Sequence, residues 1–214
     1  MIPLIIVIVV IVVLALAVVA SYNRFVSQRN AVQNAWSDID TELKRRYDLI
    51  PNLVSTVQAY AVQEKTVLTQ VTEARAQATH VSVDASTITD PQAFQKFQNA
   101  QNQLSGVLGH LLSITENYPD LKSNQNFLAL QAQLEGTENR IEIARRDYNG
   151  AVQDYNTELR TFPGVIWAST VYKSQKPAQE FAASNAAQGA PVVNFNGQTQ
   201  PNTTTEPPPP PVNP

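Results

Sequence analysis

The residue types that carry most protein chemistry are scarce in this sequence. It has two histidines, His80 and His110, and no cysteine. A di-iron site in a helical bundle needs a glutamate three residues before a histidine, whereas Gln77 and Val107 occupy those positions. Two histidines also give no pattern for a zinc site or for a nucleophile with its base, and no glycine-rich phosphate loop is present. We therefore predict a protein that is not an enzyme, with no catalytic residue, metal or cofactor.

Charged residues gather at positions 38–48, where three nearby acids suggest a cation site. Asp40 and Lys44, and likewise Glu42 and Arg46, have the i,i+4 spacing, acid first, of ion pairs on one helix. We therefore interpret this segment as a solvated helix face. The net charge of −3 provides no basic field for nucleic acid, so we expect no nucleic-acid partner.

A second charged group, at positions 138–147, has the same character and is followed by two identical pairs. Tyr148-Asn149 and Tyr155-Asn156 lie seven residues apart, which places both tyrosines on one face of a helix. One interpretation is a recognition surface, and the other is core packing with the hydroxyl groups reaching the rim. We favour packing.

A long apolar stripe with steps of three and four residues contains the most unusual charges. Such a stripe indicates a helix packed in a coiled-coil-like bundle. Arg29, Arg46 and Glu64 occupy positions of the stripe, where a charge fixes register or partner choice, or faces another chain. We take these three as candidate interaction positions. The apolar members are Phe25, Val32, Trp36, Ile39, Leu43, Ile50, Leu53, Val57, Tyr60, Val67, Val71, Ala74 and Ala78.

Two further helices follow a loop at residues 80–90. Asp90-Pro91 is typical of an N-cap followed by proline in the first turn, and Tyr118-Pro119 ends the first of these helices. The second runs from about Ser123 to Arg160. Their stripes are Phe94, Phe97, Leu104, Leu108 and Leu111, and Phe127, Leu130, Leu134, Ile141, Ala144, Tyr148, Val152, Tyr155 and Leu159.

Pro51 interrupts the first stripe, because proline lacks the N–H that would pair with the carbonyl of Tyr47 and clashes with that carbonyl. One arrangement is a hairpin near Asp48, which gives four helices of matching length. The other is a continuous helix from Tyr22 to His80. Length matching favours the hairpin, as does the family resemblance given below, so we predict an all-α, elongated, antiparallel bundle of four helices with a break or kink at Pro51.

The segment from Ile2 to Ala20 is apolar except for Pro3, and no charge precedes Arg24. About 20 apolar residues in a helix cross a bilayer core of about 30 Å. We predict a transmembrane anchor, followed by Tyr22, Arg24 and Phe25 at the membrane interface. A cleaved signal peptide is the alternative, and it is disfavoured because no basic residue precedes the apolar run.

The composition beyond the bundle changes twice. A short apolar and aromatic segment suits either a cap over the bundle or the membrane interface. The final residues are too polar and proline-rich to bury a core, so we expect disorder there. The predicted divisions are an anchor at 1–21, a helical bundle at 22–164, the short segment at 165–177 and a disordered tail at 178–214.

Several stretches of the bundle resemble the LemA family. The signature stretch is NAWSDIDTELKRRYDLIPNLVSTVQAYA at 34–61, joined by 64–75, ENYPDL at 116–121 and LEGTENRIEIARRDYNGAVQDYN at 134–156. The resemblance covers roughly residues 1–164 and departs from the family after Pro163. It implies one N-terminal transmembrane helix and an antiparallel bundle in a bacterial membrane protein, and it implies no reaction.

Taken together, these patterns predict a membrane-anchored scaffold or adaptor that binds a membrane protein or forms homo-oligomers. The alternative is an accessory subunit of a membrane enzyme, such as a quality-control protease, and co-purification in mild detergent separates the two. Arg24 and Arg29 follow the anchor, and basic residues favour the cytoplasmic side. We therefore expect a single pass through the bacterial inner (cytoplasmic) membrane, with the N-terminus outside and the bundle in the cytoplasm.

Overall fold

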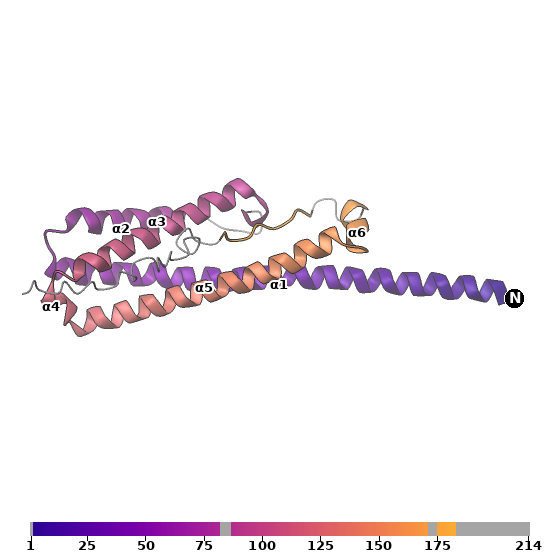
Figure 1. Ribbon diagram of the computed structural model, residues 1–214, viewed down its shortest axis with the longest axis horizontal. Coiled ribbons are helices and arrows are strands. Elements are labelled where there is room, and N and C mark those ends of the chain that lie inside the picture. Colours follow the sequence, from indigo (N-terminus) through magenta and orange to yellow (C-terminus); the bar gives the residue numbers. More distant parts are fainter. Residues whose placement is uncertain (1, 82–86, 171–174, 183–214) are drawn as a thin grey trace, which may run out of the picture. The chain divides into compact units, whose positions relative to one another are not determined.

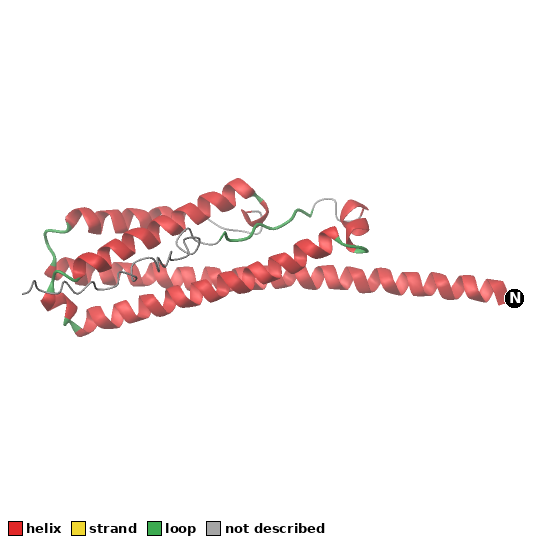
Figure 2. Cartoon of the chain, viewed as in Figure 1, coloured by secondary structure: helices red, strands yellow, loops and turns green. Residues whose placement is uncertain are grey.

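The computed structural model describes residues 2–81, 87–170 and 175–182. Within these ranges the chain is helical and contains no strand (Figure 2), which confirms the predicted all-α class. The elements are α1 (Ile2–Tyr60), α2 (Lys65–His80), a short 3-10 helix η1 (Thr87–Thr89), α3 (Pro91–Thr115), α4 (Pro119–Lys122), α5 (Gln125–Arg160) and α6 (Gly164–Thr170).

Four of these helices form an up-and-down bundle (Figure 1). α1 leads away from the N-terminus, α2 returns, α3 leads away again, and α5 returns beside α1. α1 packs mainly along α5, and α2 mainly along α3. The C-terminal end of α5 lies beside the end of the apolar run of α1. There Arg24 Nε and Glu158 Oε2 form an ion pair of 3.0 Å.

The predicted stripes form the core of this bundle. Of the apolar stripe residues on α1 and α2, Tyr60 alone is exposed, at 43 %. Every predicted stripe residue of α3 and α5 is buried except Leu130, which is half-buried. The Asp90 N-cap is confirmed as well, since its Oδ1 accepts hydrogen bonds from the amides of Gln92 (2.8 Å) and Ala93 (3.2 Å).

The core is divided into two hydrophobic clusters. The Trp36 cluster lies toward the apolar end of α1 and includes Leu43, Phe97 and Ile141. The Leu104 cluster lies toward the far end and includes Ile50, Leu104 and Leu134. On each of α1, α3 and α5 the two clusters are therefore separated by about two turns, and polar residues occupy this gap.

The chain does not reverse at Pro51, so the predicted hairpin near Asp48 is wrong. α1 continues through Pro51 to Tyr60, and the reversal takes place at residues 61–64. The alternative of one helix to His80 is equally wrong. Pro51 leaves the Tyr47 carbonyl without its usual partner, and Arg75 Nε on α2 donates to that oxygen at 2.8 Å. A contact between helices thus replaces the missing bond within the helix.

The apolar run at the start of α1 lies largely outside the bundle. Its apolar side chains from Leu4 to Val19 are exposed, Leu4 at 66 % and Leu16 at 64 %. Exposing each such side chain to water forgoes roughly 1.5–3 kcal/mol of burial free energy. α1 is also, among the described helices, the one long and apolar enough to cross a membrane. A membrane-spanning segment therefore fits this part of α1.

The pairing of Pro51 with Arg75 can be measured in a double-mutant cycle. Arg75→Met removes a charged donor to a backbone oxygen, and we expect a loss of about 1–2 kcal/mol of unfolding free energy. In a Pro51→Ala background the amide of residue 51 can again bond to the Tyr47 carbonyl, so the same substitution should cost less by about 1 kcal/mol. Urea unfolding in mild detergent, followed by circular dichroism, measures all four proteins. An equal cost of Arg75→Met in both backgrounds would contradict this account.

Candidate functional site

The two histidines do not form a site. His80 is the last residue of α2 and His110 lies on α3, and both side chains are exposed. Across the described residues, no group of three or more histidine, aspartate or glutamate side chains is arranged to hold a metal ion. The polar side chains that do come together lie in the interior of the bundle and along its grooves.

Arg46 is fully buried between the two hydrophobic clusters. Its Nη1 donates to Glu138 Oε1 at 2.8 Å and to Ser105 Oγ at 3.1 Å, and its Nη2 donates to Gln101 Oε1. The ligands of the guanidinium therefore come from α3 and α5. Burying an unpaired charge costs several kcal/mol, so the position of Arg46 depends on these partners.

The network extends to the remaining helix through Tyr47. Gln101 Nε2 donates to the Tyr47 hydroxyl at 2.6 Å, and that hydroxyl donates to the Ala78 carbonyl on α2 at 3.3 Å. Burial raises the pKa of the Tyr47 phenol, which keeps it protonated as a donor. We call Arg46, Tyr47, Gln101, Ser105 and Glu138 the Arg46 layer. It joins all four bundle helices.

Of the two ion pairs predicted within α1, one forms and the other does not. The pair between Lys44 Nζ and Asp40 Oδ2 is present at 2.6 Å and is exposed. The expected pair between Glu42 and Arg46 is absent from the described structure, because Glu42 Oε2 binds Arg140 Nε at 2.9 Å and Arg46 faces the core. The i,i+4 rule considers one helix in isolation, and here the charges pair between helices.

Positions 138–147 are likewise more than a solvated face. Glu138 binds the buried Arg46, and the Arg145 guanidinium carbon lies 5.0 Å from the centre of the Phe181 ring. Burial lowers the pKa of Arg145, and the nearby Arg46 charge acts in the same direction.

The three candidate interaction positions are not brought together. Arg46 lies in its layer, Glu64 Oε1 accepts from the Tyr118 hydroxyl at 2.9 Å at the far turn, and Arg29 is exposed on α1. Of the predicted interface residues, Tyr22 is exposed, but Phe25 belongs to the core, with its ring 5.8 Å from that of Tyr155. Their roles in partner or lipid contact stay predictions.

Residues 175–181 form an extended strap along α5. The Asn156 side chain pairs with both backbone groups of Ala178: Nδ2 donates to its carbonyl and Oδ1 accepts from its amide, each at 2.9 Å. Asn149 does the same for Phe181, at 3.0 and 2.9 Å. A carboxamide used in this way replaces the donor and acceptor of a neighbouring β-strand. The contacts therefore recognise backbone.

Further hydrogen bonds secure the strap. The Tyr148 hydroxyl donates to the Gln179 carbonyl at 3.0 Å, and the Gln179 amide donates to the Ile88 carbonyl at 2.7 Å. The Tyr155 hydroxyl donates to the Lys176 carbonyl at 3.4 Å. Burial raises the pKa of both phenols, most strongly for Tyr148, so both remain neutral donors at physiological pH.

The strap places one aromatic side chain in a pocket of the bundle. Phe181 stacks on Trp36 with ring centres 6.1 Å apart and planes at 6°, and its ring centre lies 5.0 Å from that of Phe94 and 5.5 Å from that of Tyr148. Three residues earlier, Ala178 is 5 % exposed. The groove thus accepts a small residue and then an aromatic one on an extended chain.

Sequence reasoning identified half of this groove. The tyrosines of the Tyr-Asn repeat are buried with hydroxyls at the rim, as expected, but their asparagines hold a segment that was not recognised. The boundary predicted at 177/178 falls inside the strap, and the packed unit extends to Phe181. The seven-residue repeat and an isolated aromatic residue in a polar segment were the available signals. Residues 183–214 of the predicted tail lie outside the described residues.

Comparison with known proteins identifies related chains. Residues 35–195 match the LemA family, so the match continues through the strap, beyond the expected limit at Pro163. Protein LemA of Metamycoplasma hominis is 25 % identical over 144 residues, which cover 67 % of this chain and 62 % of that protein. Magnetosome protein MamQ 2 of Paramagnetospirillum magneticum is 22 % identical over 188 residues, covering 80 % and 68 %. These names indicate no catalytic activity.

A third relative shows the same partial coverage. Magnetosome protein MamQ of Magnetospirillum gryphiswaldense is 22 % identical over 158 residues, which are 66 % of this chain and 58 % of that protein. The matched part of the chain thus spans about three fifths to two thirds of the length of these bacterial relatives.

The Arg46 layer should carry a large share of bundle stability. Arg46→Ala leaves Gln101, Ser105 and Glu138 without their charged partner, and we expect a loss of about 3 kcal/mol. Adding Gln101→Leu to Arg46→Met replaces both polar groups by apolar ones and should regain most of that loss. The exposed neighbour Arg45 is the control, and Arg45→Ala should stay within about 0.5 kcal/mol. Urea unfolding that shows equal effects of Arg46→Ala and Arg45→Ala would refute the assignment.

The strap should open when its two asparagines are removed. Asn149→Ala with Asn156→Ala deletes four hydrogen bonds to the strap, each worth about 1 kcal/mol. Trp36 would then lose its Phe181 cover. In a Trp167→Phe background, acrylamide quenching of the remaining tryptophan should increase. The control, Asn102→Ala with Asn139→Ala at exposed positions on α3 and α5, should leave the quenching unchanged. Unchanged quenching in the Asn149→Ala, Asn156→Ala variant would mean that these asparagines do not hold the strap.

Proposed function

Because this chain belongs to the LemA family, we propose that it is a membrane-anchored helical scaffold that binds extended segments of other proteins, or of other copies of itself, in the groove that holds the strap. The observation that carries the proposal is the pairing of Asn149 and Asn156 with both backbone groups of one residue each. Such contacts accept an extended chain largely independently of its side chains.

Selectivity in this groove comes from two positions. The aromatic pocket around Trp36 favours an aromatic ring, which can also contact the guanidinium of Arg145. The buried site of Ala178 favours a small residue three positions before that ring. Aromatic anchors in desolvated pockets supply much of the binding energy in protein interfaces. A partner segment therefore needs this spacing and an unpaired backbone.

The strap competes with any such partner. It is part of the same chain as α5, so its binding to the groove is intramolecular and its effective concentration there is high. A free partner at low concentration loses this competition. Confinement to a membrane raises the effective concentration of neighbouring chains, which favours a membrane protein or a second copy as the partner. The strap then occupies the groove until such a neighbour displaces it.

The same proposal assigns an orientation. Arg24 and Arg29 directly follow the apolar run, which by the positive-inside tendency puts the bundle and its groove in the cytoplasm of a bacterium, under the inner membrane. The exposed apolar segment of α1 and the bacterial relatives support membrane anchoring.

A peptide supplied in trans tests the groove. Phe181→Ala empties the aromatic pocket and weakens the strap, so a labelled peptide of residues 175–182, QKPAQEFA, should bind the full-length variant at least ten-fold more tightly than it binds the unaltered chain. Fluorescence anisotropy in detergent measures the affinity.

Two controls make this test specific. Adding Asn149→Ala and Asn156→Ala to the Phe181→Ala variant should abolish binding, and the peptide QKPAQEAA, which lacks the ring, should bind weakly to every variant. If the Phe181→Ala variant binds neither peptide, or binds both equally, the groove is not a receiver of extended segments.

A further inference from the structure

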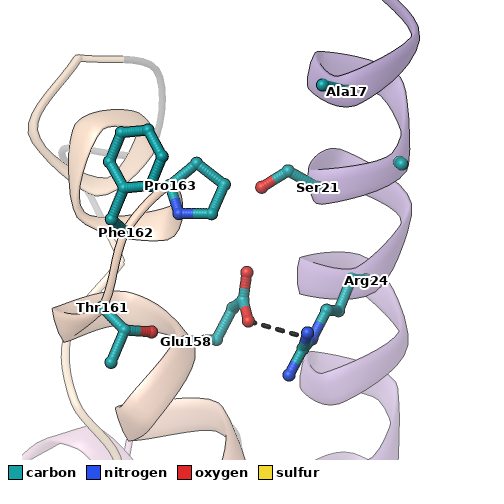
Figure 3. Close-up of a pocket in the computed structure, with 8 residues that line it drawn as sticks. Ala17, Ser21, Arg24, Glu158, Thr161, Phe162 and Pro163 are labelled. Carbon is teal, nitrogen blue, oxygen red and sulfur yellow. Dashed lines mark ion pairs between the residues drawn. The ribbon is translucent and has the colours of Figure 1, made fainter.

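A separate pocket lies where the apolar run of α1 meets the end of α5 (Figure 3). Its volume is about 550 Å³. α1 contributes Ala17, Ala20, Ser21 and Arg24, and the other wall consists of Glu158 and residues 161–163. Ala17 and Ala20 are the last apolar turn before the bundle. If α1 spans a bilayer, the pocket lies at the level of the lipid headgroups.

Ser21 is a polar group that the protein leaves unsatisfied. The residue is 6 % exposed, and its Oγ is buried with no hydrogen-bond partner among the described residues. Other hydroxyls of the same helix bond back to the preceding turn, as Ser37 does to the Gln33 carbonyl at 3.0 Å and Thr41 to the Ser37 carbonyl at 2.9 Å. The Ser21 hydroxyl points across the pocket instead (Figure 3). A buried polar group without a hydrogen bond is unfavourable, so a ligand that bonds to the Ser21 hydroxyl gains affinity.

The charges of the pocket are ordered from inside to outside. The Glu158 side chain is 7 % exposed and lies between Ser21 and Arg24, whereas the Arg24 side chain is 70 % exposed at the mouth. The wall opposite α1 is closely packed, because Gly164 lies directly against the backbone of Glu158. A Cβ at residue 164 would come within 1.9 Å of the Glu158 carbonyl oxygen. Inside, the pocket thus offers a carboxylate and a hydroxyl, which suit a hydrogen-bonding cation. At its mouth it offers a guanidinium, which suits an anion.

We propose that this pocket binds the headgroup of an aminophospholipid, with the primary ammonium on Glu158 and Ser21 and the phosphate on Arg24. A primary ammonium has three N–H donors for these two oxygen groups, while the trimethylammonium of a choline headgroup has none. The surrounding surface suits a lipid source over a soluble one. Phe162 in the pocket wall is 79 % exposed, and Val165 and Ile166, which follow it, are 43 % and 44 % exposed. Their side chains can therefore enter the bilayer interface.

Native mass spectrometry of the full-length protein released from nanodiscs tests this assignment. The nanodiscs contain equal mole fractions of phosphatidylethanolamine and phosphatidylcholine. We expect the chain to retain the ethanolamine lipid at least ten-fold in preference to the choline lipid. Ser21→Ala should reduce the preference several-fold without touching the ion pair to Arg24, and Glu158→Gln should abolish it. Ser27→Ala and Glu142→Gln, exposed on the same two helices, should leave it unchanged.

The remaining outcomes are equally decisive. Equal retention of both lipids by the unaltered chain, or an unchanged preference in the Ser21→Ala and Glu158→Gln variants, would overturn the proposal. Soluble phosphoethanolamine serves as the last probe. If it competes at millimolar concentration as well as the lipid does, the ligand is a free zwitterion and the lipid assignment is wrong.

Discussion

A buried guanidinium imposes the main constraint on this bundle. Arg46 is completely enclosed, and its two terminal nitrogens are hydrogen-bonded only when Gln101 and Ser105 of α3 and Glu138 of α5 lie at one level. Through Gln101 and Tyr47 the same level is tied to α2. A slip of one turn in any helix would leave donors and acceptors unpaired in a low-dielectric interior, at a cost of several kcal/mol. Apolar stripes alone tolerate such slips far better, so the Arg46 layer specifies the register.

A single continuous helix connects the apolar span with this layer. α1 passes from its exposed apolar segment into the Trp36 cluster and then through Pro51 to the far turn. Its proline is accommodated because Arg75 bonds to the carbonyl that proline leaves free. The strap groove and the pocket at Ser21 both lie along this helix, the former over Trp36 and the latter beside the last apolar turn.

The strap shows how one helical face can serve two purposes. The tyrosines at 148 and 155 are buried in the core, and the asparagines that follow them turn their carboxamides to an extended segment. Seven residues return to the same side of a helix, so the repeat presents two equivalent clamps. The clamps bind Ala178 and Phe181, three residues apart on an extended chain, which spans about 10 Å. Seven residues of helix rise by about the same distance.

Local patterns in the sequence determined the apolar span, the buried stripes of α1, α2, α3 and α5, and the Asp90 cap, because each depends on spacing within one segment. Even the membership of Arg46 in a stripe was evident. Its partners were not, since an i,i+4 acid and an acid 92 positions away compete for the same charge, and only packing decides between them. The reversal at 61–64 rather than at Pro51 has the same origin: Arg75, from another helix, repairs the interrupted backbone. The strap, too, was decided by tertiary structure, because a polar segment becomes ordered only when a distant helix supplies partners for its backbone.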